Sequence, residues 1–199
     1  MLNVVLFAPE IPANTGNIGR TCVVTGSRLH LVGPLGFSLD DHALHRAGLG
    51  YWRSLDVAVY KDWPAFLAAN GIATASPDPR LHLLTKKARK TYAQATYRDG
   101  DFLVLGSEST GIPEDVLAAF PESCERIPML ADAEALSDAK TWKRPEGRDN
   151  EHAALLCQDV CGNFIDPEDY RVSALNLSNA AAVVLYEALR QTGFPGMRA

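Results

Sequence analysis

Three short stretches of this 199-residue sequence combine amide, carboxylate, hydroxyl and guanidinium groups with glycine. The first, Pro9–Arg20, follows an apolar run and opens a helical pattern. Asn14, Asn17 and Arg20 recur at helical spacing, which predicts that they face one direction, and Asn14 is placed to cap the helix. Amides and a guanidinium on one face suit a ribose and a phosphate. A capped helix with a surface arginine fits the same spacing, and spacing alone does not choose between the two.

The second stretch, Leu105–Pro113, is bounded by Gly106 and Gly111 and lies between a buried strand and a proline-initiated helix. Ligands of open α/β sheets bind beyond the carboxyl ends of strands, where Glu108 could accept hydrogen bonds. An ordinary strand-to-helix loop is the alternative. The sequence contains no Gly-x-Ser-x-Gly, Walker A or Gly-x-Gly-x-x-Gly motif, so serine hydrolase, P-loop and dinucleotide-binding functions lose their main support.

The third stretch opens the last helical pattern of the chain. Asn176, Ser178 and Asn179 precede a run of small and apolar residues that allows close helix packing. Tyr186 lies two turns beyond Asn179, so the two side chains share a helix face. The alternative is a capped core helix with a packing tyrosine.

The elements that must position these stretches alternate between strand and helix. Nearly continuous apolar runs, typical of strands covered on both faces, occur at Asn3–Ala8, Arg28–Val32, Leu55–Tyr60, Leu81–Leu84, Phe102–Leu105 and Glu125–Met129. Helical patterns follow Asn14 and Pro113 and span Asp40–Leu49, Asp62–Asn70 and about Leu175–Gln191. This alternation predicts an α/β fold, with a mostly parallel sheet and helices on both faces.

One polar segment, at about residues 131–170, interrupts this rhythm. We interpret residues 1–199 as a single domain carrying this segment as an insert. The insert could act as a lid, contact RNA or extend a dimer interface. Within it, Cys157 and His152, together with Cys161, suggest a metal site, but a fourth ligand has no obvious source, so we predict no metal.

The overall charge argues against a protein that simply coats nucleic acid. The net charge is −5 and the isoelectric point about 5.5, whereas phosphate binding depends on lysine and arginine. Lys86, Lys87, Arg89 and Lys90 form a local basic patch, which is either a solvated face or a guide for RNA. Four cysteines, no long apolar run and no leader pattern indicate a cytoplasmic protein without a membrane span.

In this order and at these positions, the three polar stretches resemble the SPOUT superfamily of RNA 2′-O-methyltransferases. Within it they are similar to the small tRNA (cytidine/uridine-34-2′-O)-methyltransferases of the TrmL (YibK) type. The Pro-Glu-Ile-Pro-x-Asn-Thr-Gly-Asn-Ile-x-Arg opening and Asn-Leu-Ser-Asn before the last helix are the specific motifs. The resemblance covers about Met1–Leu130 and Ser173–Gly196, and the insert lies outside it.

The resemblance implies a C-terminal trefoil knot, an exception to the general absence of knots. It also implies that S-adenosyl-L-methionine binds, bent, within the knot. The positions carried over for the cofactor site are Leu84, Thr85, Gly106, Glu108, Gly111, Ile127, Leu175 and Asn176.

The family is dimeric, and each active site takes residues from both subunits. By resemblance, a tRNA ribose hydroxyl attacks the cofactor's methyl group, with Arg20 acting across the interface, and Tyr186 and Asn179 complete the catalytic set. The substrate-binding set is Asn14, Asn17, Arg20 and Ser178. Methylation of another RNA site, or a non-catalytic RNA-binding protein on the same fold, are the alternatives.

The sequence departs from the family pattern in two places. About forty extra residues separate the Ile-Pro-Met strand from the Asn-Leu-Ser-Asn helix, and Ala174 stands where relatives have serine. Ser107 precedes Glu108 where relatives often have proline. Neither change removes a predicted catalytic group, but both alter the expected cofactor pocket.

Overall fold

Among the residues that the structure describes, six strands form one parallel sheet. The computed structural model describes residues 1–38, 50–74, 76–129, 161–165 and 174–198. The strand order is β3-β2-β1-β5-β4-β6, and every neighbouring pair is parallel. The strands are β1 (Asn3–Phe7), β2 (Arg28–Val32), β3 (Val57–Tyr60), β4 (Leu81–Leu84), β5 (Phe102–Leu105) and β6 (Cys124–Glu125). The predicted parallel sheet is therefore confirmed.

The strand predicted at Glu125–Met129 is misplaced and too long. The ladder with β4 contains Cys124 and Glu125 alone. Arg126 leaves the sheet because its N–H donates to Lys90 O at 2.9 Å, and its own carbonyl accepts from the Tyr92 N–H at 2.9 Å. The residues after β6 therefore turn away from the sheet.

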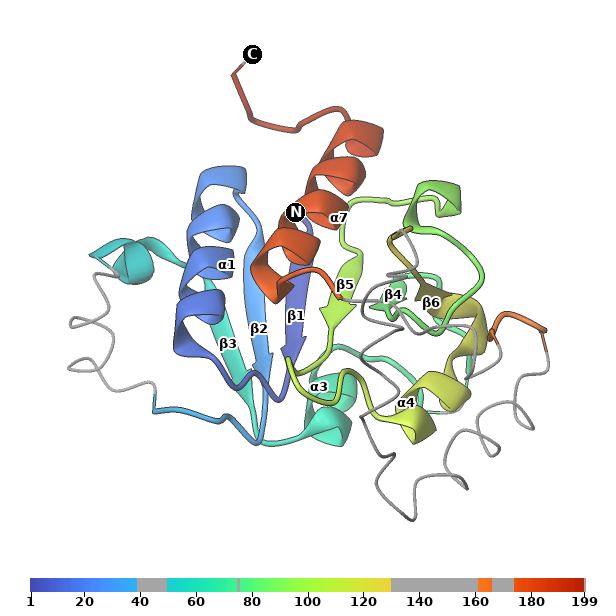
Figure 1. The fold of residues 1–199 in the computed structure, drawn as a ribbon. Coiled ribbons are helices and arrows are strands. Elements are labelled where there is room, and N and C mark those ends of the chain that lie inside the picture. Colours follow the sequence, from blue (N-terminus) through green and yellow to red (C-terminus); the bar gives the residue numbers. More distant parts are fainter. Residues whose placement is uncertain (39–49, 75, 130–160, 166–173, 199) are drawn as a thin grey trace, which may run out of the picture.

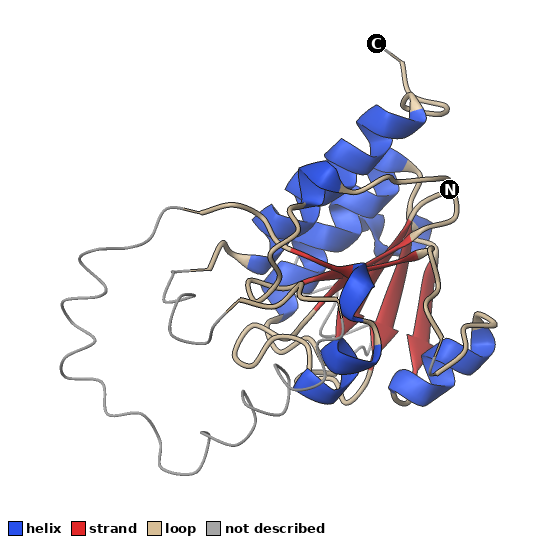
Figure 2. Ribbon diagram, turned by 90° about the vertical axis from the view of Figure 1, so that its right-hand side faces the viewer, coloured by secondary structure: helices blue, strands red, loops and turns tan. Residues whose placement is uncertain are grey.

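Helices cover both faces of the sheet, as predicted. Figures 1 and 2 show α1 and α7 together on one face and α3 and α4 on the other. One buried cluster joins α1 and α7 to Val4 and Leu6 of β1, and a second joins α3 and α4 to Val5. Alternate residues of β1 thus enter opposite clusters, as the pleat requires. The helices are α1 (Pro12–Thr25), α3 (Trp63–Ala69), α4 (Glu114–Ala119) and α7 (Leu177–Thr192).

Local sequence signals account for the ends of α3 and α7. Asp62 caps α3 by accepting a 2.9 Å bond from the Ala65 N–H, and Asn176 caps α7 by accepting from the Ser178 N–H. Gly193 ends α7 in the left-handed region at φ 78°. Short 3₁₀ turns at Gly50–Ser54, Tyr92–Gln94 and Pro121–Ser123 complete the described elements. The helix predicted at Asp40–Leu49 lies outside the described residues.

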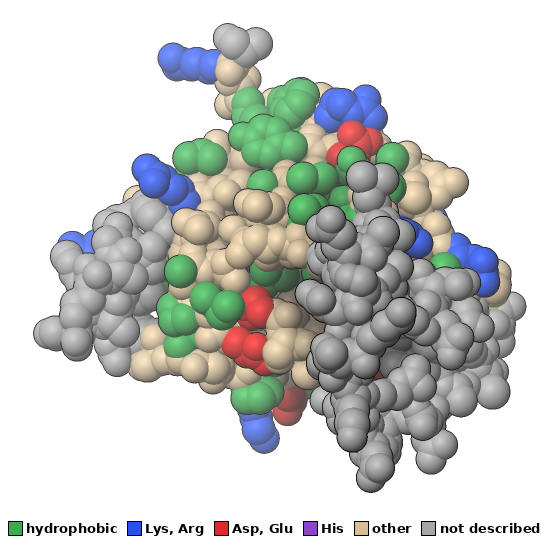
Figure 3. All heavy atoms as spheres, viewed as in Figure 1, with side chains coloured by type: hydrophobic (Ala, Val, Ile, Leu, Met, Phe, Trp, Pro, Cys, Tyr) green, Lys and Arg blue, Asp and Glu red, His purple; other side chains and the backbone are tan. Residues whose placement is uncertain are grey.

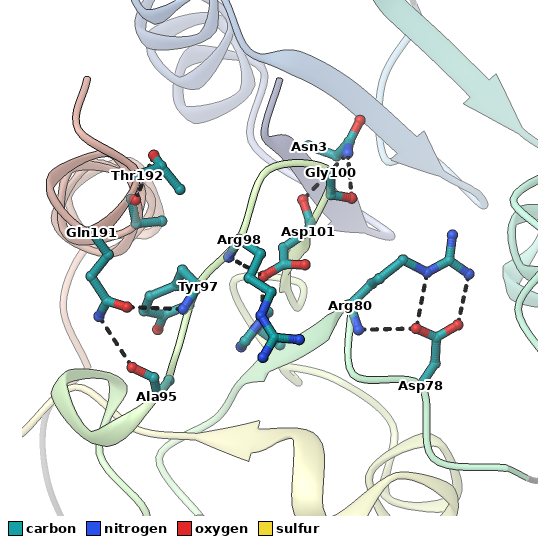
Figure 4. Close-up of polar contacts among 12 residues, drawn as sticks. Asn3, Asp78, Arg80, Ala95, Tyr97, Arg98, Gly100, Asp101, Gln191 and Thr192 are labelled. Atoms are coloured by element: carbon teal, nitrogen blue, oxygen red, sulfur yellow. Dashed lines mark hydrogen bonds and ion pairs between the residues drawn. The ribbon is translucent and has the colours of Figure 1, made fainter. Parts of the chain in front are cut away.

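The C-terminal half of α7 is tied to the loop that precedes β5. Gln191 Nε2 donates to Ala95 O at 3.1 Å, and the Tyr97 N–H donates to Gln191 Oε1 at 2.9 Å (Figure 4). In the same loop the Arg98 N–H donates to Asp101 Oδ2 at 2.6 Å. These contacts fix α7 along its face of the sheet, so its N-terminus is directed at the end of β5.

Two histidines are buried in the sheet, in contrasting environments. His30 on β2 contacts Tyr60 and Asn3, and burial lowers its pKa to about 4, so its ring is neutral. His82 on β4 lies between two buried carboxylates, with Nδ1 2.8 Å from Glu125 Oε1 and Nε2 3.1 Å from Asp101 Oδ2. Desolvation lowers the pKa of His82, but the hydrogen bonds to both carboxylates outweigh it, so the pKa lies above its ordinary value.

We expect the free energy of unfolding to fall as pH rises above about 6.5, the ordinary histidine pKa. His82 binds its proton more tightly when folded, so its contribution is complete below 6.5 and is lost as pH passes its raised folded value. The ammonium group of Lys90 and the neutral hydroxyl of Tyr97 also contact Glu125. Urea unfolding of the protein and of His82→Gln from pH 6 to 9 measures this. Parallel profiles for the two proteins would contradict the assignment.

Candidate active site

A cavity of about 410 Å³ lies beyond the carboxyl ends of β4 and β5. This is the edge of a parallel sheet where ligands usually bind. Four segments from distant parts of the chain surround the cavity, together with the start of α1. They are residues 84–87 after β4, 105–112 after β5, 127–129 after β6 and 174–180 at the start of α7.

The eight residues predicted for the cofactor all line this one cavity. They are Leu84, Thr85, Gly106, Glu108, Gly111, Ile127, Leu175 and Asn176. Asn14, predicted for the substrate, lines it as well. The structure therefore brings these residues together, while their binding of a cofactor stays a prediction. Ile11, Lys86, Met129 and Ala180 also line the cavity and were not predicted, although each lies close in sequence to a predicted position.

The loop after β5 depends on glycine for its shape. A Cβ atom on Gly106 would lie 2.1 Å from the carbonyl carbon of Gly111 and 2.2 Å from the backbone nitrogen of Ile112. The loop closes on itself because the Ser107 N–H donates to Gly111 O, and the Gly111 N–H donates back at 3.0 Å. Gly111 itself adopts φ 73°, which disfavours other residues. The polar turn is thus a compact backbone cradle at the cavity wall.

Glu108 holds this loop against the start of α1. Its carboxylate accepts hydrogen bonds from the N–H groups of Glu10 at 2.9 Å and Ile11 at 3.3 Å. The Asn14 amide donates to the same carboxylate at 2.9 Å. A negative group at the amino end of a helix also interacts favourably with the helix dipole. The prediction that Asn14 caps α1 is wrong, because the N-cap is Ile11 and the carboxylate of Glu108 receives the neighbouring N–H groups.

Asn14 also forms a hydrogen bond to the start of α7. Its side-chain oxygen accepts a 3.0 Å hydrogen bond from the Asn176 amide. Glu108, Asn14 and Asn176 therefore form a continuous chain of hydrogen bonds across the β5 loop, α1 and α7. Because Asn14 is only 6% exposed, these bonds orient it firmly, and it can hold two cavity walls together.

The remaining predicted residues lie outside the cavity lining. Asn17 and Arg20 are exposed on α1, and Asn179 and Tyr186 are exposed on α7. The prediction of one shared face for Asn14, Asn17 and Arg20 is wrong for Asn14, which is buried. Each step of three residues rotates the side-chain direction by about 60° on an α-helix, enough to turn Asn14 inward.

Ser178, predicted for the substrate, is half-buried and bonds to Asn176. Its hydroxyl donates to Asn176 Oδ1 at 2.7 Å, beside the capping bond from its own N–H. Tyr186 is 47% exposed, so it does not pack into the core as the alternative interpretation required.

The basic patch is largely turned toward protein groups. Lys87 forms an ion pair with Glu114, Lys90 Nζ lies 3.1 Å from Glu125 Oε1, and Arg89 Nε donates to Phe164 O at 2.9 Å. Lys86 and Lys87 line the cavity, and desolvation together with the charge of Lys87 lowers the pKa of Lys86. The patch is therefore not a plain solvated face, and its possible role as an RNA guide stays a prediction.

The described part of the chain contains no group of three or more histidine, cysteine or acidic side chains able to hold a metal ion. Cys161 is exposed, whereas Cys157 and His152 lie outside the described residues. No helix among the described residues is both long and apolar enough to cross a membrane.

The sequence of this chain matches a known protein family. A family model described as the SpoU rRNA Methylase family matches residues 1–137, and the chain belongs to this family. The resemblance inferred from the sequence motifs is thereby confirmed.

The names of individual relatives specify the reaction more closely than the family name does. A tRNA (cytidine(34)-2′-O)-methyltransferase from Burkholderia ambifaria is 40% identical over 198 residues, which cover 98% of this chain and 99% of the relative. A structure described as giving insight into 2-OH methylation of C/U34 on tRNA is 33% identical, with a TM-score of 0.66, over 96% of this chain and 95% of that one. The SpoU methyltransferase AviRb from Streptomyces viridochromogenes, solved with AdoMet, is 20% identical and shares the fold, with a TM-score of 0.63 over 96% of this chain and 60% of its own.

Proposed function

We propose that this protein transfers a methyl group from S-adenosyl-L-methionine to the ribose 2′-hydroxyl of the wobble cytidine or uridine, position 34, of tRNA. The observation that carries the proposal is the cavity where all eight sequence-predicted cofactor residues meet. Identity of 40% to a position-34 methyltransferase over nearly its whole length favours this nucleotide over another RNA site. A tRNA substrate also agrees with the cytoplasmic location expected from the sequence.

The residues present fit the cofactor. The cavity volume of about 410 Å³ falls in the range of small-molecule sites, and its walls combine apolar side chains such as Leu84, Leu105 and Ile127 with backbone polar groups. At Gly106 the absence of a side chain allows the backbone of Gly111 and Ile112 to approach closely, which shapes this wall of the cavity. Bound S-adenosyl-L-methionine would supply an electrophilic methyl group on a sulfonium.

We infer that the segments around the cavity form the C-terminal trefoil knot expected for this family. In support, the start of α7 shares the cavity with the segments after β4, β5 and β6. The Asn176–Asn14 hydrogen bond also ties this segment to the opposite end of the sequence.

A second copy of the chain is needed to complete the proposed site. Arg20, Asn179 and Tyr186 do not line their own cavity, yet all three are exposed on the face that α1 and α7 form. Apolar side chains gather on this face, over both helices (Figure 3). Exposed apolar patches commonly mark interfaces, and a twofold dimer would place each face against its copy. The apolar residues exposed on these helices and next to them are Ile11, Val24, Leu175, Val183, Tyr186 and Phe194.

In this proposal the protein contributes mainly alignment and charge stabilisation. Arg20 of one protomer orients the ribose hydroxyl and stabilises the negative charge that develops on its oxygen. A guanidinium keeps its protons, so the hydroxyl proton passes to solvent or to an RNA phosphate and not to Arg20. Bound cofactor would supply the methyl carbon for the new bond to the ribose oxygen, and its sulfur would retain the electron pair of the carbon–sulfur bond.

Incubation with total tRNA and methyl-labelled cofactor tests the proposal. We expect label on a 2′-oxygen at position 34, and none on a matched tRNA with a 2′-deoxyribose there. Label at another nucleotide would favour the alternative substrate. Cofactor binding without transfer to any RNA would favour the non-catalytic protein. Failure of the cofactor to bind would overturn the assignment altogether.

A further inference from the structure

A short segment of the insert, residues 161–165, is docked beside the cavity. Phe164 pairs with Ala88 in an antiparallel bridge, and the Ile165 N–H donates to Lys87 O at 2.9 Å. The Phe164 side chain is 2% exposed and belongs to the buried cluster under α3 and α4. This part of the insert is therefore built into the fold.

Asn163 uses its whole side-chain amide to join two separate segments. Its Nδ2 donates to Pro121 O at 2.8 Å and to Cys124 O at 2.9 Å, both just before or within β6. Its Oδ1 accepts from the Lys90 N–H at 2.9 Å. An amide can donate twice and accept at once, which alanine, serine or aspartate cannot reproduce.

The two segments that Asn163 joins continue directly into two walls of the cavity. Residues 88–90 follow the cavity-lining Lys86 and Lys87, and β6 precedes Ile127 and Met129, which also line the cavity. Backbone hydrogen bonds also join the two segments, since the Thr85 N–H donates to Glu125 O at 2.8 Å and the Arg126 N–H donates to Lys90 O at 2.9 Å. Asn163 does not line the cavity, and its side chain adds three hydrogen bonds to these two segments.

The docked segment also divides the long connection between β6 and α7. After Ile165, only residues 166–173 precede Ala174 and Leu175, which line the third wall. The entropic cost of holding chain ends together grows with loop length, so an anchor near the end of an insert favours a fixed start for α7.

We propose that Asn163 is a positioning residue that holds the walls at residues 84–87 and 127–129 in the separation the methyl donor requires. The inference rests on the proposed function, since it assigns this cavity to the cofactor. Asn163 does not line the cavity itself and acts through the two segments it joins.

The test is titration of S-adenosyl-L-methionine into wild type, Asn163→Ala and Asn163→Asp by calorimetry, with steady-state methylation of tRNA. We expect the cofactor Kd and KM to rise about five- to tenfold in Asn163→Ala, as partial loss of three net hydrogen bonds implies. The KM for tRNA, and kcat at saturating cofactor, should stay near wild type. Asn163→Asp, which keeps an acceptor for Lys90 but loses both donated bonds, should also bind the cofactor more weakly.

Asn70→Ala is the matched control, because Asn70 Nδ2 donates to Phe66 O at 2.8 Å at the end of α3, away from the cavity. It should lower the melting temperature without changing the cofactor Kd. Wild-type affinity in a folded Asn163→Ala, or an equal rise in Asn70→Ala, would overturn the inference. If Asn163→Ala does not fold, Asn163→Asp decides in the same way. If wild type itself binds no cofactor, the proposed function fails, whatever the variants do.

Discussion

Replacing Arg20 by alanine should abolish methyl transfer and leave cofactor binding near normal. Arg20 is exposed on α1 and does not line the cavity of its own chain, so its removal should not disturb the cofactor walls. Loss of one preorganised charge-stabilising donor typically lowers kcat by about 100- to 1000-fold. Single-turnover methylation of tRNA, with calorimetric titration of S-adenosyl-L-methionine, measures both quantities on one preparation.

Arg20→Lys separates charge from geometry. Lysine keeps the positive charge but lacks the planar fork of a guanidinium, so most of the activity should still be lost. Thr21→Ala, on the next residue of α1, controls for general damage to the helix, because within the described part of the chain its hydroxyl bonds only to Asn17 O. Retained turnover in Arg20→Ala would remove Arg20 from the active site.

Local patterns predicted the fold well because its signals are short in range. The runs at Arg28–Val32, Leu81–Leu84 and Phe102–Leu105 became strands with the predicted bounds. Asp62 caps the start of α3 and Gly193 caps the end of α7, each through hydrogen bonds to residues a few positions away. The prediction for β6 extended too far because the apolar residues Ile127 and Met129 line a cavity and do not belong to a strand, and hydrophobic periodicity does not distinguish these two environments.

The connections within the site were not predictable in the same way. The hydrogen bond between Asn14 and Glu108 spans 94 residues, and the one between Asn14 and Asn176 spans 162. Nothing in the sequence near Asn14 distinguishes an amide that caps its own helix from one that bonds to segments far away in the sequence. Asn163 lies inside a polar insert, where the composition carries no sign of its docking. Motif resemblance located the walls of the cavity, whereas the bonds that join them required the structure.

Replacing Gly106 by alanine should weaken cofactor binding more than any other added methyl group in this loop. The added Cβ would lie 2.1 Å and 2.2 Å from backbone atoms of Gly111 and Ile112, which cannot rotate away as a side chain would. Overpacking of this kind costs about 3 kcal/mol, which corresponds to roughly a hundredfold weaker Kd if the strain falls on the loop. Calorimetric titration of the cofactor, with the melting temperature of the free protein, distinguishes a distorted loop from an unfolded chain.

Gly111→Ala provides the comparison that isolates the collision. A Cβ on Gly111 meets nothing within 4 Å, so only its φ of 73° penalises alanine, by about 1–2 kcal/mol. Gly111→Ala should therefore weaken cofactor binding clearly less than Gly106→Ala. An equal effect would show that backbone conformation, and not the close approach of two chain segments, determines the shape of the cavity wall.

Mixing Arg20→Ala with Gly106→Ala extends the Gly106 experiment to the dimer. A mixed dimer of Arg20→Ala and Gly106→Ala has one site with an intact cavity from the first chain and an intact guanidinium from the second. If each site is shared, co-refolding the two variants should restore part of the wild-type activity at a cofactor concentration near the wild-type Kd, where each variant alone has very low activity. If Arg20 instead serves the cavity of its own chain, every site in the mixture carries a defect, and activity should not return.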